Sequence, residues 1–314
     1  MLAIAFVLDL VFGDPVYPFH PIRLMGKAIE RGETYVRRLG MSDRWAGGGL
    51  AILFPLFVFL VVWLLIFMLA KVHMGFAWAA SIFGIYSSIS VGDLKKEGLR
   101  IYKDVQAGDI KKARQDLAGI VGRDTQALDQ KGILRGAIET VAESTVDGIV
   151  APLIYAALGG APLALTYKAV NTLDSMIGRR NDRYRTFGYV AAKQDDWWNW
   201  FPARCSYWII GFASLLAKHR AKEALRIGWQ DGMAAHRGNS DIPESAFAGA
   251  LGLELGGAST YEGCTVEKPI LGSSEKDICP DDLVKSLHLM IVSAWSSLLL
   301  VLSVKYGIVF IIQN

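Results

Sequence analysis

Long apolar runs alternate with polar segments along this chain, and the length of each run predicts how it meets a membrane. No charged residue occurs between Arg44 and Lys71, where Leu50–Ala70 reads LAILFPLFVFLVVWLLIFMLA. At about 1.5 Å per residue, a helix of this length crosses a hydrocarbon core of about 30 Å. We therefore predict membrane spans near residues 1–12, 49–71, 72–92 and 286–312, the third returning as a hairpin after the second.

Three apolar segments carry features that need separate interpretation. Residues 1–12 lack a basic start and a small-residue cleavage site, so we interpret them as a retained membrane helix and not as a signal peptide. Residues 148–167 contain the break Gly159-Gly160-Ala161-Pro162, which predicts either one kinked span or two half-helices that enter and leave on one side. Residues 197–217 either span the bilayer or lie in its interface.

The polar segment 93–147 shows apolar residues at helical spacing, such as Leu117, Ile120 and Val121, which predicts two or three packed amphipathic helices. Strand signals are scarce, and no linker or internal repeat divides the chain. The prediction is therefore an all-α, polytopic membrane protein, a single domain over 1–314, whose amphipathic and interfacial helices form one substantial polar face.

Composition and charge narrow the function classes. The chain is 52% hydrophobic and only 20% charged, which is too apolar for an ordinary soluble domain. A net charge of +3, scattered along the chain, does not predict nucleic-acid binding. Basic residues outnumber acidic ones from Arg23 to Arg44, as the positive-inside rule expects of a cytoplasmic loop. The three cysteines show neither metal-ligand spacing nor an even disulfide count.

One stripe of charged residues leads directly into the apolar segment 148–167. Arg135, Glu139, Glu143 and Asp147 are spaced four apart, so a helix places them on one face. The three carboxylates repel one another unless cations compensate. The stripe indicates a magnesium or substrate site at the bilayer surface, because hard divalent ions take oxygen ligands and often act with a phosphate. The alternative is a solvated helix face that pairs with Arg135 and nearby lysines.

Further polar clusters adjoin apolar segments, and each has a structural and a functional interpretation. The arginines around Arg183 suit phosphate or carboxylate recognition, or anchor the chain at the membrane surface. The stripe that begins at Lys168 could hold a phosphate or form the polar side of an interfacial helix. The candidate substrate- and phosphate-binding residues are Asp14, His20, Arg23, Arg123, Asp124, Arg183, Tyr184, Arg204 and Asn239.

A series of motifs runs in order along nearly the whole chain: LDLVFGDPVYPFHPIRLMG, IVGRDTQALD, AIETVAESTVDGIVAPLIYAALGGAPLALTYKAVNTLDSMIG, DRYRTFG, DDWWNWFPAR, NSDIPESAFAGALGLELGG, TYEG and EKPILG. Together they resemble the CobD/CbiB-type adenosylcobinamide-phosphate synthase family of cobalamin biosynthesis. The resemblance implies amide formation between a propionate carboxylate of adenosylcobyric acid and (R)-1-amino-2-propanol or its O-phosphate, with ATP and Mg²⁺. The chain departs from the family pattern at Ser144, Arg179 and residues 238–241.

The implied reaction assigns roles to these clusters. Making an acyl phosphate develops charge that Mg²⁺ and Arg or Lys neutralise, and the attacking ammonium must lose a proton, for which Glu244 is the candidate base. The candidate metal ligands are Glu139, Glu143, Asp147, Asp195 and Asp196. The candidate catalytic residues are Glu139, Glu143, Asp147, Lys168, Asn171, Asp174 and Glu244.

The resemblance also implies a place in the cell and a set of partners. These are the cell (inner, cytoplasmic) membrane with the polar site facing the cytoplasm, the two substrates, the lipid bilayer, and other late membrane enzymes of cobalamin synthesis. Two alternatives stay open. One is a non-catalytic membrane protein related to β-lactamase regulation, and the other is a small-solute transporter, which inverted repeats would support.

Overall fold

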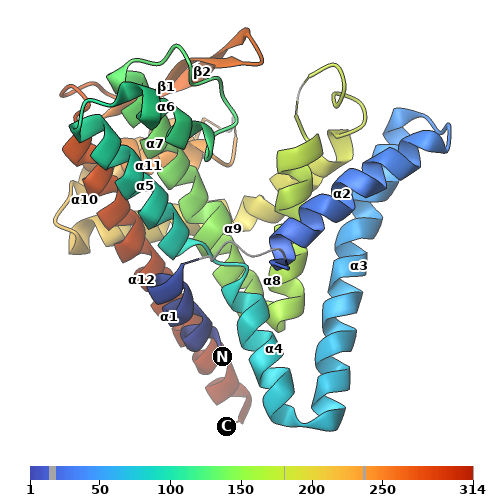
Figure 1. The fold of residues 1–314 in the computed structure, drawn as a ribbon. Coiled ribbons are helices and arrows are strands. Elements are labelled where there is room, and N and C mark those ends of the chain that lie inside the picture. The colour runs from blue at the N-terminus through green and yellow to red at the C-terminus, as the bar shows by residue number, and fades with distance from the viewer. Residues whose placement is uncertain (14–18, 180, 236–237, 314) are drawn as a thin grey trace. The chain divides into compact units, whose positions relative to one another are not determined.

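The computed structural model describes residues 1–13, 19–179, 181–235 and 238–313, and most of them are helical (Figure 1). The elements in chain order are α1 (Leu2–Phe12), α2 (Pro21–Arg38), α3 (Asp43–Val72), α4 (Met74–Tyr86), α5 (Val91–Gln106), α6 (Ile110–Ala118), α7 (Gln130–Thr145), the π-helix η1 (Val146–Val150), α8 (Ala151–Ile177), α9 (Tyr189–Leu216), α10 (Ala221–Ile227), the π-helix η2 (Gly228–Met233), α11 (Asp241–Leu251), β1 (Glu254–Tyr261), β2 (Cys264–Gly272) and α12 (Pro280–Gln313). The predicted helical membrane fold is confirmed, with a small antiparallel hairpin of β1 and β2 added to it.

The structure supports membrane embedding by the length and apolar composition of its helices. Within the described residues, four segments are long and apolar enough to cross a membrane: Asp43–Val72, Met74–Gln106, Gln130–Ile177 and Pro280–Gly307. The predicted spans 49–71, 72–92 and 286–312 each overlap one of them. The helix α9, which contains most of the uncertain segment 197–217, does not meet these criteria, and α1 is a shorter apolar helix.

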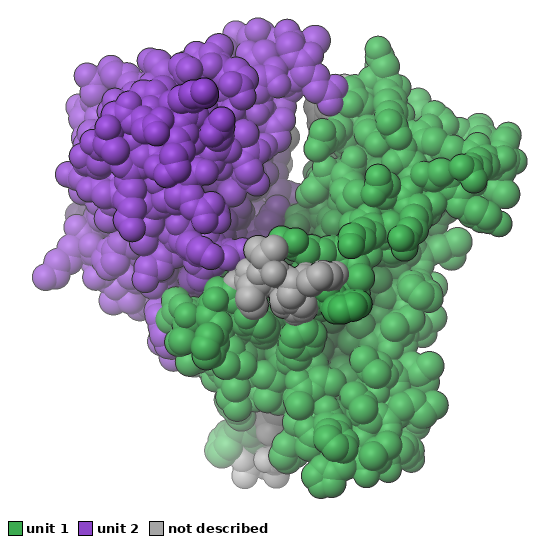
Figure 2. All heavy atoms as spheres, in the orientation of Figure 1, with its two compact units in different colours: residues 1–90, 151–202, 300–314 green, residues 91–150, 203–299 purple. Residues whose placement is uncertain are grey.

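The chain divides into two compact units, coloured separately in Figure 2. Unit 1 contains residues 1–90, 151–202 and 300–314, and unit 2 contains residues 91–150 and 203–299. The polar segment 93–147 belongs to unit 2, where it forms α5, α6 and α7 as the amphipathic pattern predicts. Each unit therefore has its own packing and its own polar network.

In unit 1, the glycine pair predicted as a helix break interrupts α8. Gly159 and Gly160 both leave helical geometry, and Gly160 has φ 66° and ψ −157°, a region that only glycine adopts without strain. The chain changes direction there (Figure 1), and Pro162 follows at a position where the helix needs no N–H donor. Non-helical backbone at membrane depth is tolerated when it packs within protein.

Unit 1 builds its core where α8 meets α2 and α3. Ile29 of α2, Ala51 of α3 and Leu173 of α8 are fully buried there together with Phe187 from the loop after α8. A Cβ at Gly47 would lie 1.9 Å from the Phe187 carbonyl oxygen, so only glycine permits this approach of α3 to the loop. The core thus holds the loop residues 181–188 against α2 and α3.

In unit 2, α11 is the central element. It packs against α10, η2, α7 and both strands of the hairpin, and Ile242 to Leu251 are all buried. Small residues such as Gly249 allow this, because a Cβ at that position would lie 2.4 Å from the Glu223 carbonyl oxygen. The acidic N-terminal part of α11 is thereby placed beside α7.

The hairpin has a two-residue turn and a bulge. Glu262 and Gly263 at the turn have φ values of 49° and 80°, as a type I′ turn requires. The register shifts between Leu255 and Gly257, and Gly256 has φ 82° with no room for a Cβ, which would lie 2.0 Å from the Pro269 carbonyl oxygen. Such a bulge redirects side chains locally.

Candidate active site in unit 2

The stripe predicted on α7 is a real helix face, but its three carboxylates have different environments. Glu139 is 1% exposed, Glu143 is exposed to solvent, and Asp147 is half-buried in the π-helix η1 that continues α7. Single-turn π-helices occur frequently at functional sites because they shift the side chains that follow. The stripe therefore combines a buried anchor with one accessible carboxylate.

Glu139 is held on both of its oxygens by protein donors. Its Oε2 accepts a hydrogen bond from Arg123 Nη2, and its Oε1 accepts one from the backbone N–H of Gly256 at 2.7 Å. Arg135 Nε lies 4.0 Å from the same Oε1. Burial alone would lower the pKa of Arg123, but the Glu139 charge outweighs it and raises that pKa. Glu139 and Arg123 thus join α7, the loop before it and the bulge of β1.

Glu244 of α11 is only 2% exposed. Burial, followed by the negative charge of Glu143, raises the pKa of the Glu244 carboxyl well above its ordinary value. Among the described residues, neither Glu143 nor Glu244 has a side-chain hydrogen bond or ion pair. The pair therefore combines an accessible carboxylate with a nearby buried one that holds its proton more strongly than usual.

Lys268 of β2 is the cation that sequence reasoning missed. It pairs in register with Gly257, directly after the bulge that binds Glu139. Burial lowers the pKa of Lys268, but the charges of Glu244, Tyr261 and Glu143 outweigh burial and raise it. The segment EKPILG carried the resemblance, yet nothing in its spacing relates Lys268 to a helix more than 120 residues earlier.

Asp124 and Asn239 have structural contacts inside unit 2. The Asp124 carboxylate accepts a hydrogen bond from Gly263 N at 2.8 Å, and its backbone N–H donates to the Thr260 carbonyl oxygen, so it fixes the hairpin turn. Asn239 Oδ1 accepts a 3.4 Å hydrogen bond from Arg204 Nη1. Asp124 therefore ties the loop before α7 to the hairpin, and Asn239 ties the segment before α11 to α9.

The remaining predicted residues of α8 and α9 lie in unit 1. Lys168 Nζ donates to Asn171 Oδ1 at 3.4 Å, and Asp174 lies half-buried near the end of α8. Asp195 Oδ2 accepts from Asn199 Nδ2 at 3.0 Å, and Asp196 forms an exposed ion pair of 2.9 Å with Lys193. Lys168, Asn171, Asp195 and Asp196 thus each have a partner on their own helix.

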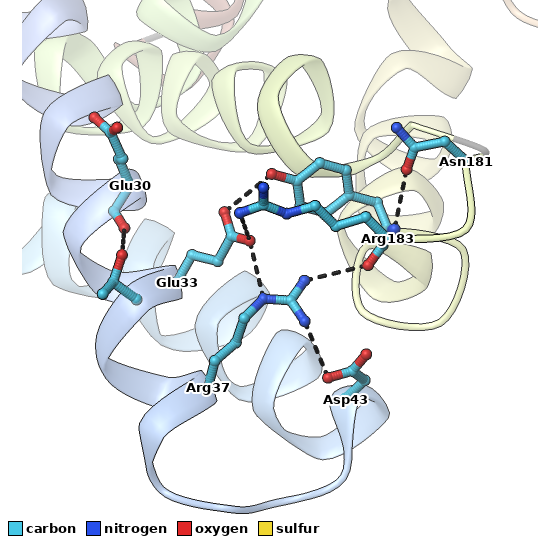
Figure 3. A network of polar contacts seen from close by, with 8 residues as sticks. Glu30, Glu33, Arg37, Asp43, Asn181 and Arg183 are labelled. Carbon is cyan, nitrogen blue, oxygen red and sulfur yellow. Dashed lines mark hydrogen bonds and ion pairs between the residues drawn. The ribbon is translucent and has the colours of Figure 1, made fainter. Parts of the chain in front are cut away.

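Arg183 and Tyr184, predicted to bind phosphate, converge on a glutamate that the sequence did not single out (Figure 3). Glu33 Oε1 accepts from Arg183 Nη2 and from Arg37 Nε, both at 2.9 Å, and Oε2 accepts from Tyr184 OH at 3.1 Å. Burial would raise the pKa of Glu33, but these hydrogen bonds outweigh it and lower that pKa. The network ties the loop after α8 to α2.

The first predicted cluster is only partly described. Asp14 lies outside the described residues, while His20 is buried immediately before α2 and Arg23 is exposed in its first turn. The structure therefore brings Arg123, Glu139, Glu143 and Glu244 together in unit 2 and groups Arg183 with Tyr184 in unit 1. Among the residues that the structure describes, no three His, Cys, Asp or Glu side chains are placed to hold a metal ion.

Comparison with known proteins identifies the family. The family model described as CobD/Cbib protein matches residues 2–290, and the chain, whose apolar helices point to a membrane-embedded protein, belongs to this family. A relative named cobalamin biosynthesis protein CobD from Klebsiella pneumoniae is 40% identical over 98% of this chain and 97% of its own length. CobD from Clostridium perfringens is 43% identical over 92% of each chain, and CbiB from Salmonella typhimurium is 38% identical over 97% of each. No solved structure matches.

Proposed function

We propose that this protein joins a propionate carboxylate of adenosylcobyric acid to (R)-1-amino-2-propanol or its O-phosphate, forming adenosylcobinamide or its phosphate. The family match over nearly the full chain supports a biosynthetic role over a regulatory membrane protein or a transporter. The observation that carries the proposed chemistry is the pair of Glu143, accessible on α7, and Glu244, buried on α11.

Amide formation requires a free amine, because an ammonium has no lone pair to attack a carbonyl carbon. The ammonium first gives one proton to a base. When the resulting amine nitrogen bonds to the activated carbonyl carbon, a second proton leaves the nitrogen and the departing leaving group takes it up. A carboxylate with a raised pKa accepts a proton more readily than an ordinary one, so Glu244 suits the role of general base. Glu143 lies where it can orient the ammonium beforehand.

ATP and Mg²⁺ would supply activation of the substrate carboxylate as an acyl phosphate. Mg²⁺ commonly takes one or two protein carboxylates and completes its shell with water and phosphate oxygens. A preformed site of three protein ligands does not fit the described residues, since both oxygens of Glu139 are engaged by Arg123 and Gly256. We infer that Mg²⁺ would be held chiefly by the nucleotide phosphates.

The location follows from the same proposal. The four candidate spans support an integral protein of the cell membrane, and the basic segment 23–44, which contains most of α2, supports a cytoplasmic orientation of the polar site. Late enzymes of the pathway that handle the same corrinoid would share this face.

The test is product formation by the detergent-purified protein. Adenosylcobyric acid, aminopropanol phosphate, ATP and Mg²⁺ are incubated with it, and the amide is sought by mass spectrometry. The proposal expects the amide with the wild type and none with Glu143→Gln, which should fold normally because its side chain is exposed. Absence of the amide with either amine donor, while the corrinoid still binds, would refute the proposed reaction.

A further inference from the structure

The charges around Glu244 do not balance. Glu139 is neutralised by Arg123, and among the described residues Lys268 is the cation whose charge acts most strongly on both Glu143 and Glu244. Two carboxylates, Glu143 on α7 and Glu244 on the adjacent α11, therefore face one lysine in a region where Glu244 is nearly inaccessible to water. Like charges that share such a region destabilise one another unless a cation joins them.

Glu244 also lacks a partner of its own. Its side chain is 98% removed from solvent, yet among the described residues it receives no hydrogen bond and forms no ion pair. Burying a carboxylate without donors costs folding free energy. An apolar side chain at this position would avoid that cost, so the retained carboxylate indicates a function. A positively charged hydrogen-bond donor suits both side chains, because Glu143 and Glu244 are both acceptors when ionised.

Two kinds of cation could fill this role, and the geometry favours one of them. A divalent metal held by the protein without a nucleotide needs several protein oxygen ligands, and no suitable group of three exists among the described side chains. A primary ammonium needs only acceptors for three N–H donors. Lys268, itself an alkylammonium, already lies near these carboxylates. Its positive charge repels an incoming divalent ion more strongly than an incoming monovalent ammonium.

We propose that Glu143 and Glu244 form the binding site for the primary ammonium of the amine donor, and that this site acts without a metal ion. The inference rests on the proposed function and deepens it, because it assigns the amine donor to the carboxylate stripe that the sequence predicts to hold magnesium. Glu143 provides the accessible acceptor and Glu244 the buried one, which leaves Glu244 in place to take the proton.

The test measures binding without turnover. Calorimetric titration of the detergent-purified protein in EDTA uses (R)-1-amino-2-propanol, with propane-1,2-diol as a neutral probe of similar size. The wild type is expected to bind the amine and not the diol, and Glu143→Gln and Glu244→Gln should each weaken amine binding at least tenfold. Glu267→Gln is the matched control, since Glu267 is exposed on β2 next to Lys268 and should leave affinity unchanged.

Several results would overturn the inference. One is equal amine affinity in the wild type and in both glutamine variants, and another is no amine binding by the wild type. A third is amine binding that requires added Mn²⁺, with the spectroscopic signal of bound Mn²⁺ lost in Glu143→Gln. If Glu244→Gln fails to fold, the exposed position of Glu143 keeps the test decisive. Glutamate-dependent amine binding without amide formation would refute the proposed function alone, and amide formation with unchanged binding in both variants would refute this inference alone.

Discussion

Two buried glutamates, one in each unit, show how burial can serve structure in one place and chemistry in another. Glu33 of α2 is 6% exposed and Glu244 of α11 is 2% exposed. Glu33 receives hydrogen bonds from Arg37, Arg183 and Tyr184, and its pKa is lowered. Glu244 has no such donors, and its pKa is raised. A satisfied carboxylate stabilises its unit, whereas an unsatisfied one is kept ready for a ligand or a proton.

The largest expected effect separates the two residues by activity. Glu244→Gln should lower the rate of amide formation by about 10²–10⁴-fold, since it removes a general base, while Glu33→Gln should keep the wild-type rate wherever the protein remains folded. Initial rates of product formation, normalised to folded protein, measure this. An active Glu244→Gln variant beside an inactive Glu33→Gln variant would reverse the assignment.

The second effect separates them by stability. Glu33→Gln removes the charge that three donors share, so unfolding should become easier by about 1–3 kcal/mol. Denaturant titration in detergent micelles checks this value. The matched control is Glu30→Gln in the same helix, because Glu30 is exposed and contributes only its backbone carbonyl to a hydrogen bond from Thr34. Equal destabilisation by both substitutions would show that the Glu33 network adds nothing.

A third substitution tests the frame that holds the unit 2 site. Gly256→Ala introduces a Cβ 2.0 Å from the Pro269 carbonyl oxygen at a positive φ, which should cost about 1–3 kcal/mol and disturb the N–H that binds Glu139. Gly263→Ala at the turn is the control, since space is open there although φ is also positive. Equal effects on thermal unfolding and on activity would mean that the bulge does not position the site.

The smallest effect is a pair of opposite pH dependences. Glu33 has a lowered pKa, so it contributes stability above its unfolded value near 4.5 that is lost as pH falls. Glu244 has a raised pKa, so the folded state keeps its proton longer and stability falls as pH rises above about 4.5. Thermal midpoints measured across pH check this. Glu33→Gln should reduce the loss of stability as pH falls, and Glu244→Gln should reduce the loss of stability as pH rises. The same change of slope in both variants would contradict the comparison.

Local pattern was enough to predict much of this arrangement. The charge-free run ending before Lys71 became α3, and the glycines at 159 and 160 became a break in α8, because both depend on neighbouring residues only. Helical spacing also placed Glu139 and Glu143 on one face of α7. These are the features that period and length determine.

The pairing of distant residues was beyond the sequence pattern. Arg123 and Arg183 carry the charge that phosphate recognition needs, but they lie against Glu139 and Glu33, which are 16 and 150 residues away along the chain. Lys268 reaches its position through the register of a hairpin whose first strand contains two adjacent glycines and therefore gives a weak strand signal. The sequence placed Glu33 in a basic segment and did not indicate its role, because its burial depends on contacts with the loop after α8.

The most direct test of the central claim compares two nucleophiles in one variant. Glu244→Gln and the wild type are supplied with the corrinoid, ATP and Mg²⁺, and then with either aminopropanol phosphate or hydroxylamine, which is largely uncharged at neutral pH and needs no base to release its lone pair. The account predicts that Glu244→Gln loses the amide product and still forms the hydroxamate. Formation of both products at wild-type rates, or loss of both to the same degree, would contradict the role of Glu244 as the base.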